Sequence, residues 1–406
     1  MQKVLVKIKI TIKKEPVLSI AVILAVISMF VVHPDDTYVS YIDFRTLAIL
    51  FCLMVIVAGI REIGVFDYIA QSLLNRVKSI SGIVMILVLL CFFLSMVITN
   101  DVALITFVPF AILILKRFPK EVRCHWLIPC VVMQTAAANL GSMMTPIGNP
   151  QNLYLYGKAN LQASSFFLLM LPYTVLSLLI LIIWIAIHTK RKTDNETNCM
   201  DGSTHKAVYA KTQSRKISDK LRLTIYLILF FLSLLAVGRL ISIWIVFACV
   251  IAWAAAFDSK LFRNADYALL GTFTALFVFI GNLGRIPQFF SILQNLIQTR
   301  EVIIAVAASQ VMSNVPAAIL LSGFTNNYRA LIIGTNLGGL GTMIASMASL
   351  ISFKYISRED ASLRGKYFIW FTAANVILLV ILLAAAKILG PVSYTHLRAH
   401  ETSLHL

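Results

Sequence analysis

The stretch NLGSMMTPIGNPQNLYLY, residues 139–156, decides how this chain folds. It lies in an apolar neighbourhood, yet it contains three asparagines, two glycines, two prolines, a glutamine, a serine and a threonine. In lipid, backbone that leaves a helix must bury its freed N–H and C=O groups in protein or turn them to a water-filled cavity. The stretch therefore predicts a broken membrane helix that presents backbone and amide groups to a ligand.

The surrounding composition is that of an integral membrane protein. Of the 406 residues, 59% are hydrophobic and 13% are charged, against about 25% charged residues in a soluble domain. Runs near or above the ~18 apolar residues that indicate a membrane span recur along the chain. They include Val17–Val32, Phe166–Ile187, Leu223–Val237, Ile241–Phe257 and Tyr367–Leu389.

The net charge of +17 comes from basic residues in short loops between apolar runs. This pattern follows the positive-inside rule, so it indicates contact with anionic lipid and not with nucleic acid. Five lysines among residues 3–14 predict a cytoplasmic N-terminus in a multi-pass protein of the plasma (inner) membrane. The segment 189–222 has nine basic and four acidic residues, which predicts a cytoplasmic linker.

The linker divides the chain into an N-terminal half, residues 1–188, and a C-terminal half, residues 223–390. The end of the sequence, SYTHLRAHETSLHL at residues 393–406, changes abruptly from apolar to polar. It resembles a translated adapter read-through, so we expect a non-native tail there and leave it out of the fold.

In the first half, the legs Ile83–Ile98 and Val102–Leu115 flank the sequence TND at residues 99–101. The basic residues before and after this unit predict that both of its ends are cytoplasmic. This placement fits either of two structures: two full spans joined by a tight turn, or a re-entrant hairpin over 83–115. Legs of 16 and 14 residues cover about 24 and 21 Å, short of the ~30 Å hydrocarbon core, which favours the hairpin.

The second half contains a shorter unit of the same kind, a hairpin over 302–324. Its legs, 302–312 and 317–324, flank the sequence SNVP. At 1.5 Å per residue these legs reach only about 16 and 12 Å. They are too short to cross the bilayer, so a re-entrant hairpin is predicted.

The two halves repeat this order of segments. Leu47–Gly59 and Leu269–Gly281 each precede an amphipathic stretch, of which the first, Arg61–Asn75, predicts an interfacial helix. A hairpin and then a broken helix follow, at 126–156 in the first half and 331–352 in the second. Asn-Leu-Gly opens both breaks. Because one unit enters the membrane from outside and the other from inside, an inverted repeat is predicted.

The predicted fold is thus an all-α integral membrane protein with an inverted structural repeat, two re-entrant hairpins and two broken transmembrane helices. Paired broken helices in inverted repeats indicate a secondary transporter with its site at the repeat interface. Small residues in membrane helices also allow close packing. For individual glycines that alternative stays open: Gly141, Gly338, Gly339 and Gly341.

The hairpin tips and the sequence TPIGNPQN resemble the ion transporter superfamily, specifically its citrate-transporter-like and arsenical-permease-like members. The resemblance covers nearly the whole chain up to about Gly390. In the related divalent anion:sodium symporters, the tips and broken helices hold Na⁺ and the carboxylate, and one domain moves like an elevator against a scaffold. The resemblance therefore implies an elevator-type transporter, and relatives of this kind are often homodimers.

The resemblance also implies site residues. The first site would be lined by Thr99, Asn100, Asn139, Gly141, Thr145, Pro146, Gly148, Asn149 and Asn152. The second would be lined by Ser313, Asn314, Asn336, Gly338, Thr342 and Ser346. Na⁺ would bind at Asn100, Asn139, Asn314 and Asn336.

Asp101 is a carboxylate at membrane depth, which by default indicates a functional group such as a proton carrier or cation ligand. It could also be the N-cap of the second hairpin leg. Neither tip has a complete Ser-Asn-Thr, and Thr-Asn-Asp is closer to the arsenical-permease-like branch. Coupling to Na⁺ and coupling to H⁺ both stay open.

We expect a secondary transporter that moves a small anion together with Na⁺ or H⁺, with no cofactor. An arsenite-type or cation/proton antiporter and a passive anion channel are the alternatives, and a separate ATPase partner stays open. No His-Glu-x-x-His, Gly-x-Ser-x-Gly or Walker loop occurs, so an enzyme is not predicted. Tyr154 and Tyr156 are expected to be interfacial anchors.

Overall fold

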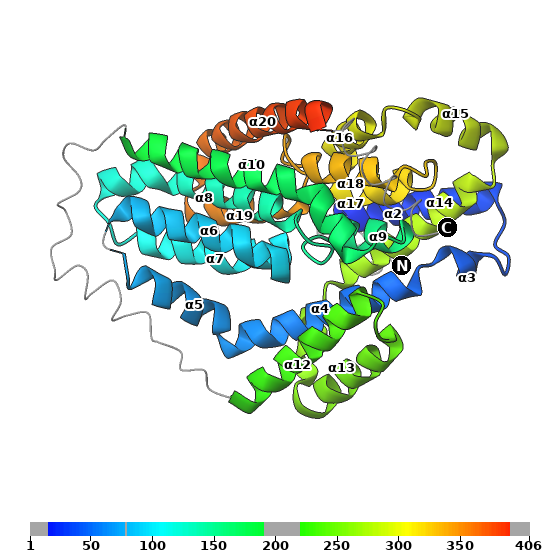
Figure 1. Cartoon of the computed structure of the whole chain (residues 1–406), viewed down its shortest axis with the longest axis horizontal. Coiled ribbons are helices and arrows are strands. Elements are labelled where there is room, and N and C mark those ends of the chain that lie inside the picture. Colours follow the sequence, from blue (N-terminus) through cyan, green and yellow to red (C-terminus); the bar gives the residue numbers. More distant parts are fainter. Residues whose placement is uncertain (1–14, 78, 191–219, 390–406) are drawn as a thin grey trace, which may run out of the picture.

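The computed structural model describes residues 15–77, 79–190 and 220–389, and this part of the chain is an elongated bundle of helices (Figure 1). Six of its helices are long and apolar enough to cross a membrane. They begin with α4 (Phe44–Ile63), α6 (Ile80–Ile98) and α10 (Ala163–Lys190), and continue with α12 (Lys220–Val237), α14 (Tyr267–Gly284) and α20 (Arg364–Leu389). These helices confirm the prediction of an all-α integral membrane protein for the described residues.

The shorter elements complete the two halves. The first half adds α2 (Pro16–Val31), α3 (Tyr38–Tyr41), α5 (Val65–Leu74), α7 (Asn100–Leu115), α8 (Lys120–Ser142) and α9 (Pro150–Lys158). The second half adds α13 (Ile243–Phe257), η1 (Ser259–Asn264), α15 (Pro287–Ile297), α16 (Glu301–Met312), α17 (Asn314–Leu321), α18 (Tyr328–Leu337), α19 (Met347–Glu359) and η2 (Ala361–Leu363).

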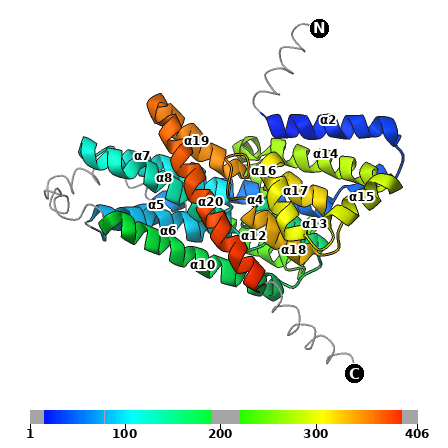
Figure 2. The same ribbon diagram turned by 90° about the horizontal axis from the view of Figure 1, so that it is seen from above.

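One side of the molecule is built from long helices that pack on α4 and α14. Helix α2 lies along α14, as Figure 2 shows, and α12 and α13 pack on α4. The starts of α4 and α14 are alike: Asp43 caps α4 by accepting from the Thr46 N–H at 2.9 Å, and Asp266 caps α14 by accepting from Leu269 at 2.9 Å. An acidic N-cap stabilises a helix start by about 0.5–2 kcal/mol.

The segment between α2 and α4 is tied to the end of α14. Arg285 forms an ion pair with Asp35 at 2.7 Å. A hydrogen bond from Thr37 and then the Arg285 guanidinium hold the pKa of Asp35 below its usual value. This contact joins the two halves on the surface of the molecule.

The other side holds α6, α7 and α8, which run side by side (Figure 1). Helix α6 begins at Ile80, three residues before the predicted leg, because Ser79 caps it by accepting from the Gly82 N–H at 3.2 Å. Its 19 residues span about 28 Å. Helix α6 is thus among the helices long enough to cross a membrane, so its length does not favour a hairpin. Helix α7 begins at Asn100, two residues before its predicted start, and its 16 residues span about 24 Å, still short of the hydrocarbon core.

Helices α16 and α17 form the corresponding unit of the second half and are short. They have 12 and 8 residues, or about 18 and 12 Å. The second helix begins at Asn314, three residues earlier than the predicted leg, so the tip asparagine lies in its first turn. Neither helix can cross a ~30 Å hydrocarbon core.

Both predicted breaks occur. Residues 143–149 separate α8 from α9, and residues 338–346 separate α18 from α19. The flanking helices extend beyond the predicted limits, to Lys120 and Lys158 in the first half and to Tyr328 and Glu359 in the second. The pieces after the breaks exchange partners: α9 packs on α17 and α18, and α19 packs on α7 and α8.

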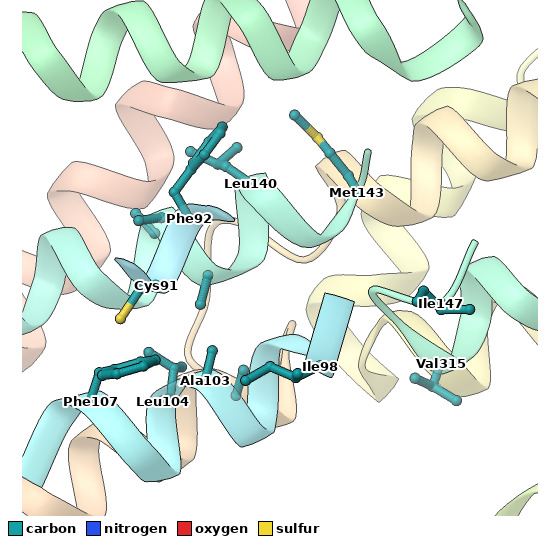
Figure 3. Close-up of a cluster of buried hydrophobic side chains, with 14 of the residues drawn as sticks. Cys91, Phe92, Ile98, Ala103, Leu104, Phe107, Leu140, Met143, Ile147 and Val315 are labelled. Atoms are coloured by element: carbon teal, nitrogen blue, oxygen red, sulfur yellow. The ribbon is translucent and has the colours of Figure 1, made fainter. Parts of the chain in front are cut away.

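An apolar cluster lies around the first break (Figure 3). Phe92 of α6, Leu104 of α7 and Leu140 of α8 are each at most 1% exposed. Across the first break, Ile147 lies near Val315 of α17, so side chains of both halves close the cluster.

The amphipathic segment begins later than predicted. Residues 61–63 continue α4, and the chain turns at Gly64, whose φ of 88° is the left-handed conformation that glycine tolerates. Helix α5 follows, and α15 takes the same place after α14. The N-terminal lysines, residues 191–219 of the linker and the predicted non-native tail lie outside the described residues.

Candidate functional site

The two tips have the same backbone geometry. Thr99 has φ 74° and ψ 151°, and Ser313 has φ 75° and ψ 155°, which are unusual values for residues other than glycine. Such conformations cost about 1–3 kcal/mol each and concentrate at functional sites. The next residue of each tip donates its N–H to a break: Asn100 to Gly148 O at 3.2 Å, and Asn314 to Ala345 O at 3.0 Å.

Asparagine side chains then connect the tips and the breaks. Asn139, at the end of α8, accepts from Asn100 Nδ2 at 3.0 Å and from Ser346 Oγ at 3.0 Å. Asn336, at the end of α18, donates to Asn152 Oδ1 at 2.6 Å. Two of these bonds link the N-terminal half to the C-terminal half, so the structure brings together residues that the sequence analysis had placed in two separate sites.

Other predicted residues shape the first break. Thr145 donates to the Met96 carbonyl at 2.5 Å and accepts from the Gly148 N–H at 3.0 Å. Asn149 donates to Ser142 Oγ at 2.6 Å. These contacts hold the unwound backbone in place within the protein.

Gly141 and Gly338 allow close approach of neighbouring segments. A Cβ atom on Gly141 would lie 2.0 Å from the Phe92 carbonyl oxygen, and one on Gly338 would lie 2.6 Å from Ser309 Oγ. Packing is therefore a sufficient reason for both glycines. Pro146 is buried within the first break, between α8 and α9.

The second break depends on Gln310, which the sequence analysis does not identify. Its Nε2 donates to the carbonyls of Gly338 and Leu340, both at 2.9 Å, and its Oε1 accepts from the Thr342 N–H at 2.8 Å. The signal was a glutamine in a mostly apolar leg, three residues before Ser313. Thr342 itself is exposed and bonds to the Gln310 backbone, apart from the asparagine network.

Several buried polar atoms around the breaks have no hydrogen-bond partner among the described residues. Such atoms are uncommon, cost about 1–3 kcal/mol each and need an explanation. A bound solute or ion would supply partners for them. They are Asp101 Oδ1, Asn139 Nδ2, both amide atoms of Gln151, Asn336 Oδ1 and Ser349 Oγ.

A cavity of about 770 Å³ leads to the first tip. It lies between α4, α5 and α7 and reaches Thr99, Asp101, Ile147 and Pro150. Among its lining residues, carboxylates outnumber cations: Glu62, Asp67, Asp101 and Asp266 against Arg61.

Asp101 lies on the cavity wall in the first turn of α7. The N-cap of α7 is Thr99, so the interpretation of Asp101 as an N-cap is wrong. Its backbone N–H donates to Asn100 Oδ1 at 2.9 Å, which orients the asparagine toward Asn139. The Asp101 side chain lines the cavity.

The tips and breaks also bring helix N-termini together. Helix α7 begins beside the residues that precede α9, and α17 begins beside the residues that precede α19. Each helix N-terminus carries roughly half a positive charge and unpaired N–H groups. Amide oxygens and freed carbonyls suit Na⁺, while N-termini and amide N–H groups suit an anion.

Tyr154 and Tyr156 do not anchor the protein at the interface. They are 4% and 3% exposed, and the Tyr154 hydroxyl bonds to Ser322 Oγ at 2.8 Å. The interfacial prediction is wrong because α9 packs inside the protein against α17 and α18.

The apolar helices, the interrupted crossings and the buried amides between them define a multi-pass membrane protein of the transporter class. Comparison with known families agrees. A family model described as "Citrate transporter" matches residues 5–328, and the chain belongs to this family.

Relatives cover most of the chain. An uncharacterized transporter of Methanocaldococcus jannaschii is 31% identical over 91% of this chain and 96% of its own length. The inner membrane protein YbiR of Escherichia coli is 29% identical over 88% and 93%, respectively. The silicon efflux transporter LSI3 of Oryza sativa subsp. japonica is 28% identical over 35% of this chain and 28% of its own length.

Proposed function

We propose that the protein is a secondary active transporter that moves a small anion together with Na⁺ or H⁺. The observation that carries this proposal is the network of Asn100, Asn139, Asn152 and Asn336, which has unpaired buried amide atoms and is surrounded by helix N-termini. Its donors suit an anion and its oxygens suit a cation. Moving one charge down a membrane potential yields about 2.3 kcal/mol per 100 mV, enough to drive accumulation.

The proposal includes an inverted repeat with two re-entrant hairpins. Four matched features support it: the alike starts of α4 and α14, the equal dihedral angles at Thr99 and Ser313, the tip-to-break hydrogen bonds, and the exchange of α9 and α19 between halves. In this scheme α6–α7 and α16–α17 are the hairpins, and the first hairpin reaches the site from the cytoplasmic side.

Alternating access would occur along the seam between α4 and α9. Residues of α4 from Leu50 to Glu62 line the 770 Å³ cavity. Residues of α4 from Arg45 to Ile49 line a smaller cavity of about 220 Å³. Less than one helical turn of α4 separates the two lining sets. In the elevator mechanism, the hairpins and broken helices would slide past α4 and α14 and carry the solute from one cavity to the other. A continuous passive channel fits this division less well.

The orientation follows from the positive-inside rule, with the N-terminus and the linker in the cytoplasm of a bacterial-type inner membrane. The larger cavity then opens toward the cytoplasm, because it lies at the end of α4 that leads to α5 and the first hairpin. The protein in this conformation would face inward.

Asp101 favours a second candidate, an arsenite-type or cation/proton antiporter. A fixed carboxylate on the cavity wall would repel an anion unless a proton or cation neutralised it. The rice relative is named for efflux of silicon, which fits a metalloid solute. In this candidate Asp101 carries the coupling proton.

Thermal unfolding of the purified protein separates the two candidates. A ligand that binds only the folded state stabilises it, by about 2.7 kcal/mol at one hundred times its Kd. The protein would be heated in Na⁺ or choline with citrate, succinate, sulfate or arsenite. We expect Na⁺ and an anion together to raise the melting temperature by more than the sum of the rises that each gives alone.

The symporter would be contradicted, and the antiporter supported, if stabilisation by a solute did not depend on Na⁺, changed with pH and was absent in Asp101→Asn. A protein that no solute stabilises, and that takes up none in proteoliposomes, would refute transport of these solutes altogether.

A further inference from the structure

The smaller cavity lies at the far end of the α4–α9 seam from Asp101. Its volume is about 220 Å³, and it is lined by the start of α4, the end of α9, Val237 at the end of α12 and Phe277 within α14. Its lining is more polar than that of a packing defect. The polar residues are Tyr41, Asp43, Arg45, Thr46, Tyr154, Tyr156 and Lys158.

Two cations, Arg45 and Lys158, face this cavity from different helices. Within the described part of the chain, no carboxylate lies within ion-pair distance of either one. The one acidic lining residue, Asp43, is occupied at the start of α4, because its two oxygens accept from the N–H and the hydroxyl of Thr46 at 2.9 and 2.6 Å. The lining of the cavity therefore carries one more positive than negative charge, because the Asp43 carboxylate offsets only one of the two cations.

Both cations have positions that suit a bound oxyanion. One guanidinium nitrogen of Arg45 donates to the Ala236 carbonyl at 3.0 Å, which anchors the side chain while its other N–H groups remain for a ligand. The Lys158 ammonium lies 5.8 Å from the ring centre of Tyr154, a cation–π contact that holds it at the wall. Arginine binds carboxylate and sulfate through paired hydrogen bonds, and lysine adds a point charge.

The charge of this cavity is opposite to that of the larger one. The smaller cavity, which we call the outer cavity, is lined by two cations, Arg45 and Lys158, and by one carboxylate, Asp43. The larger or inner cavity is lined by four carboxylates and one cation, Arg61. Cavities lined by one sign of charge concentrate ligands of the opposite sign. An anion would therefore gather at the outer end of the seam and leave from the inner end.

We propose that the cavity between Arg45, Lys158 and Tyr154 is a second binding site, which captures small oxyanions on the outer face before they reach the asparagine network. Its place on a transport route rests on the proposed function, but anion binding in it does not. Capture in this cavity would raise the local concentration of anions at the outer entrance.

The test separates this site from the asparagine network by removing the network first. The full-length protein carrying Asn139→Ala, or Asn100→Ala should the first variant fold poorly, would be titrated with citrate and with sulfate at low ionic strength. The melting temperature is the readout. We expect both anions to stabilise this background still.

Adding Lys158→Gln should weaken that stabilisation about tenfold in apparent affinity, the loss expected for one charge-assisted hydrogen bond. Lys158→Arg should restore it. Arg300→Gln is the matched control, because it removes the same charge from an exposed residue that lines neither cavity, and it should leave the titration unchanged.

The proposal is overturned if the Asn139→Ala and Asn100→Ala backgrounds lose all stabilisation by both anions, or if Lys158→Gln titrates like Arg300→Gln. Failure of the proposed function would look different. In that case the wild-type protein would take up no solute, while the titrations would still show whether Lys158→Gln weakens anion binding relative to Arg300→Gln.

Discussion

Replacing Asn139 with alanine is expected to lower solute uptake about a hundredfold. The change removes the acceptor for both Asn100 and Ser346, and leaving a buried donor unpaired costs about 1–3 kcal/mol. At about 1.4 kcal/mol per factor of ten, two such losses account for an effect of this size. Initial uptake into proteoliposomes, normalised to the amount of monodisperse protein, measures it.

Asn375→Ala is the matched control for this prediction. Asn375 is also fully buried, but its Nδ2 donates to the Phe371 carbonyl within its own helix, α20. Its replacement should leave uptake within a few-fold of wild type. Equal losses in both variants would show a general effect of removing a buried amide, and uptake near wild type in Asn139→Ala would contradict a role for the network.

Replacing Gly141 with alanine is expected to destabilise the protein strongly. The added Cβ would lie 2.0 Å from the Phe92 carbonyl oxygen and 2.8 Å from Ser95 Oγ. Relief requires α8 to move away from α6 along their contact, and overpacking of this kind costs about 1–3 kcal/mol or more. The melting temperature and the monodisperse fraction in detergent should both fall.

The control is Gly365→Ala in the first turn of α20, where a Cβ would meet nothing within 4 Å. Because alanine favours helix by about 1 kcal/mol over glycine, this variant should be as stable as wild type or more so. If Gly141→Ala were equally stable, the close approach of α6 and α8 at this glycine would be wrong.

The sequence was most informative where it violates the rules for a membrane helix. Glycine, proline and asparagine at membrane depth have few explanations, so both breaks could be predicted from Asn139–Asn152 and Asn336–Ser349. The repeat of Asn-Leu-Gly added a second, independent indication. The family match over residues 5–328 agrees with the resemblance based on these motifs.

Helix limits were harder to predict because they depend on local capping. A serine at position 79 extends α6 by three residues, and a left-handed glycine at position 64 ends α4 inside the predicted amphipathic stretch. Neither signal changes the hydrophobic pattern. For this reason the length of α6 no longer favours a hairpin, whereas the 16 residues of α7 still fall short of the hydrocarbon core.

Side-chain roles within the site were the least predictable. Gln310 was overlooked because its leg is mostly apolar, and only the structure shows its amide bonded to the second break. Tyr154 and Tyr156 have the composition of an interfacial pair, but the exchange of α9 onto α17 buries them. Contacts between distant halves are not encoded in a local pattern.

Both hairpin tips are proposed to form one solute site. The most direct measurement is uptake by Asn100→Ala and by Asn314→Ala, each compared with wild type at equal amounts of folded protein. We expect each variant to lose uptake although it is expressed and remains monodisperse. Near-normal uptake in both variants would contradict it.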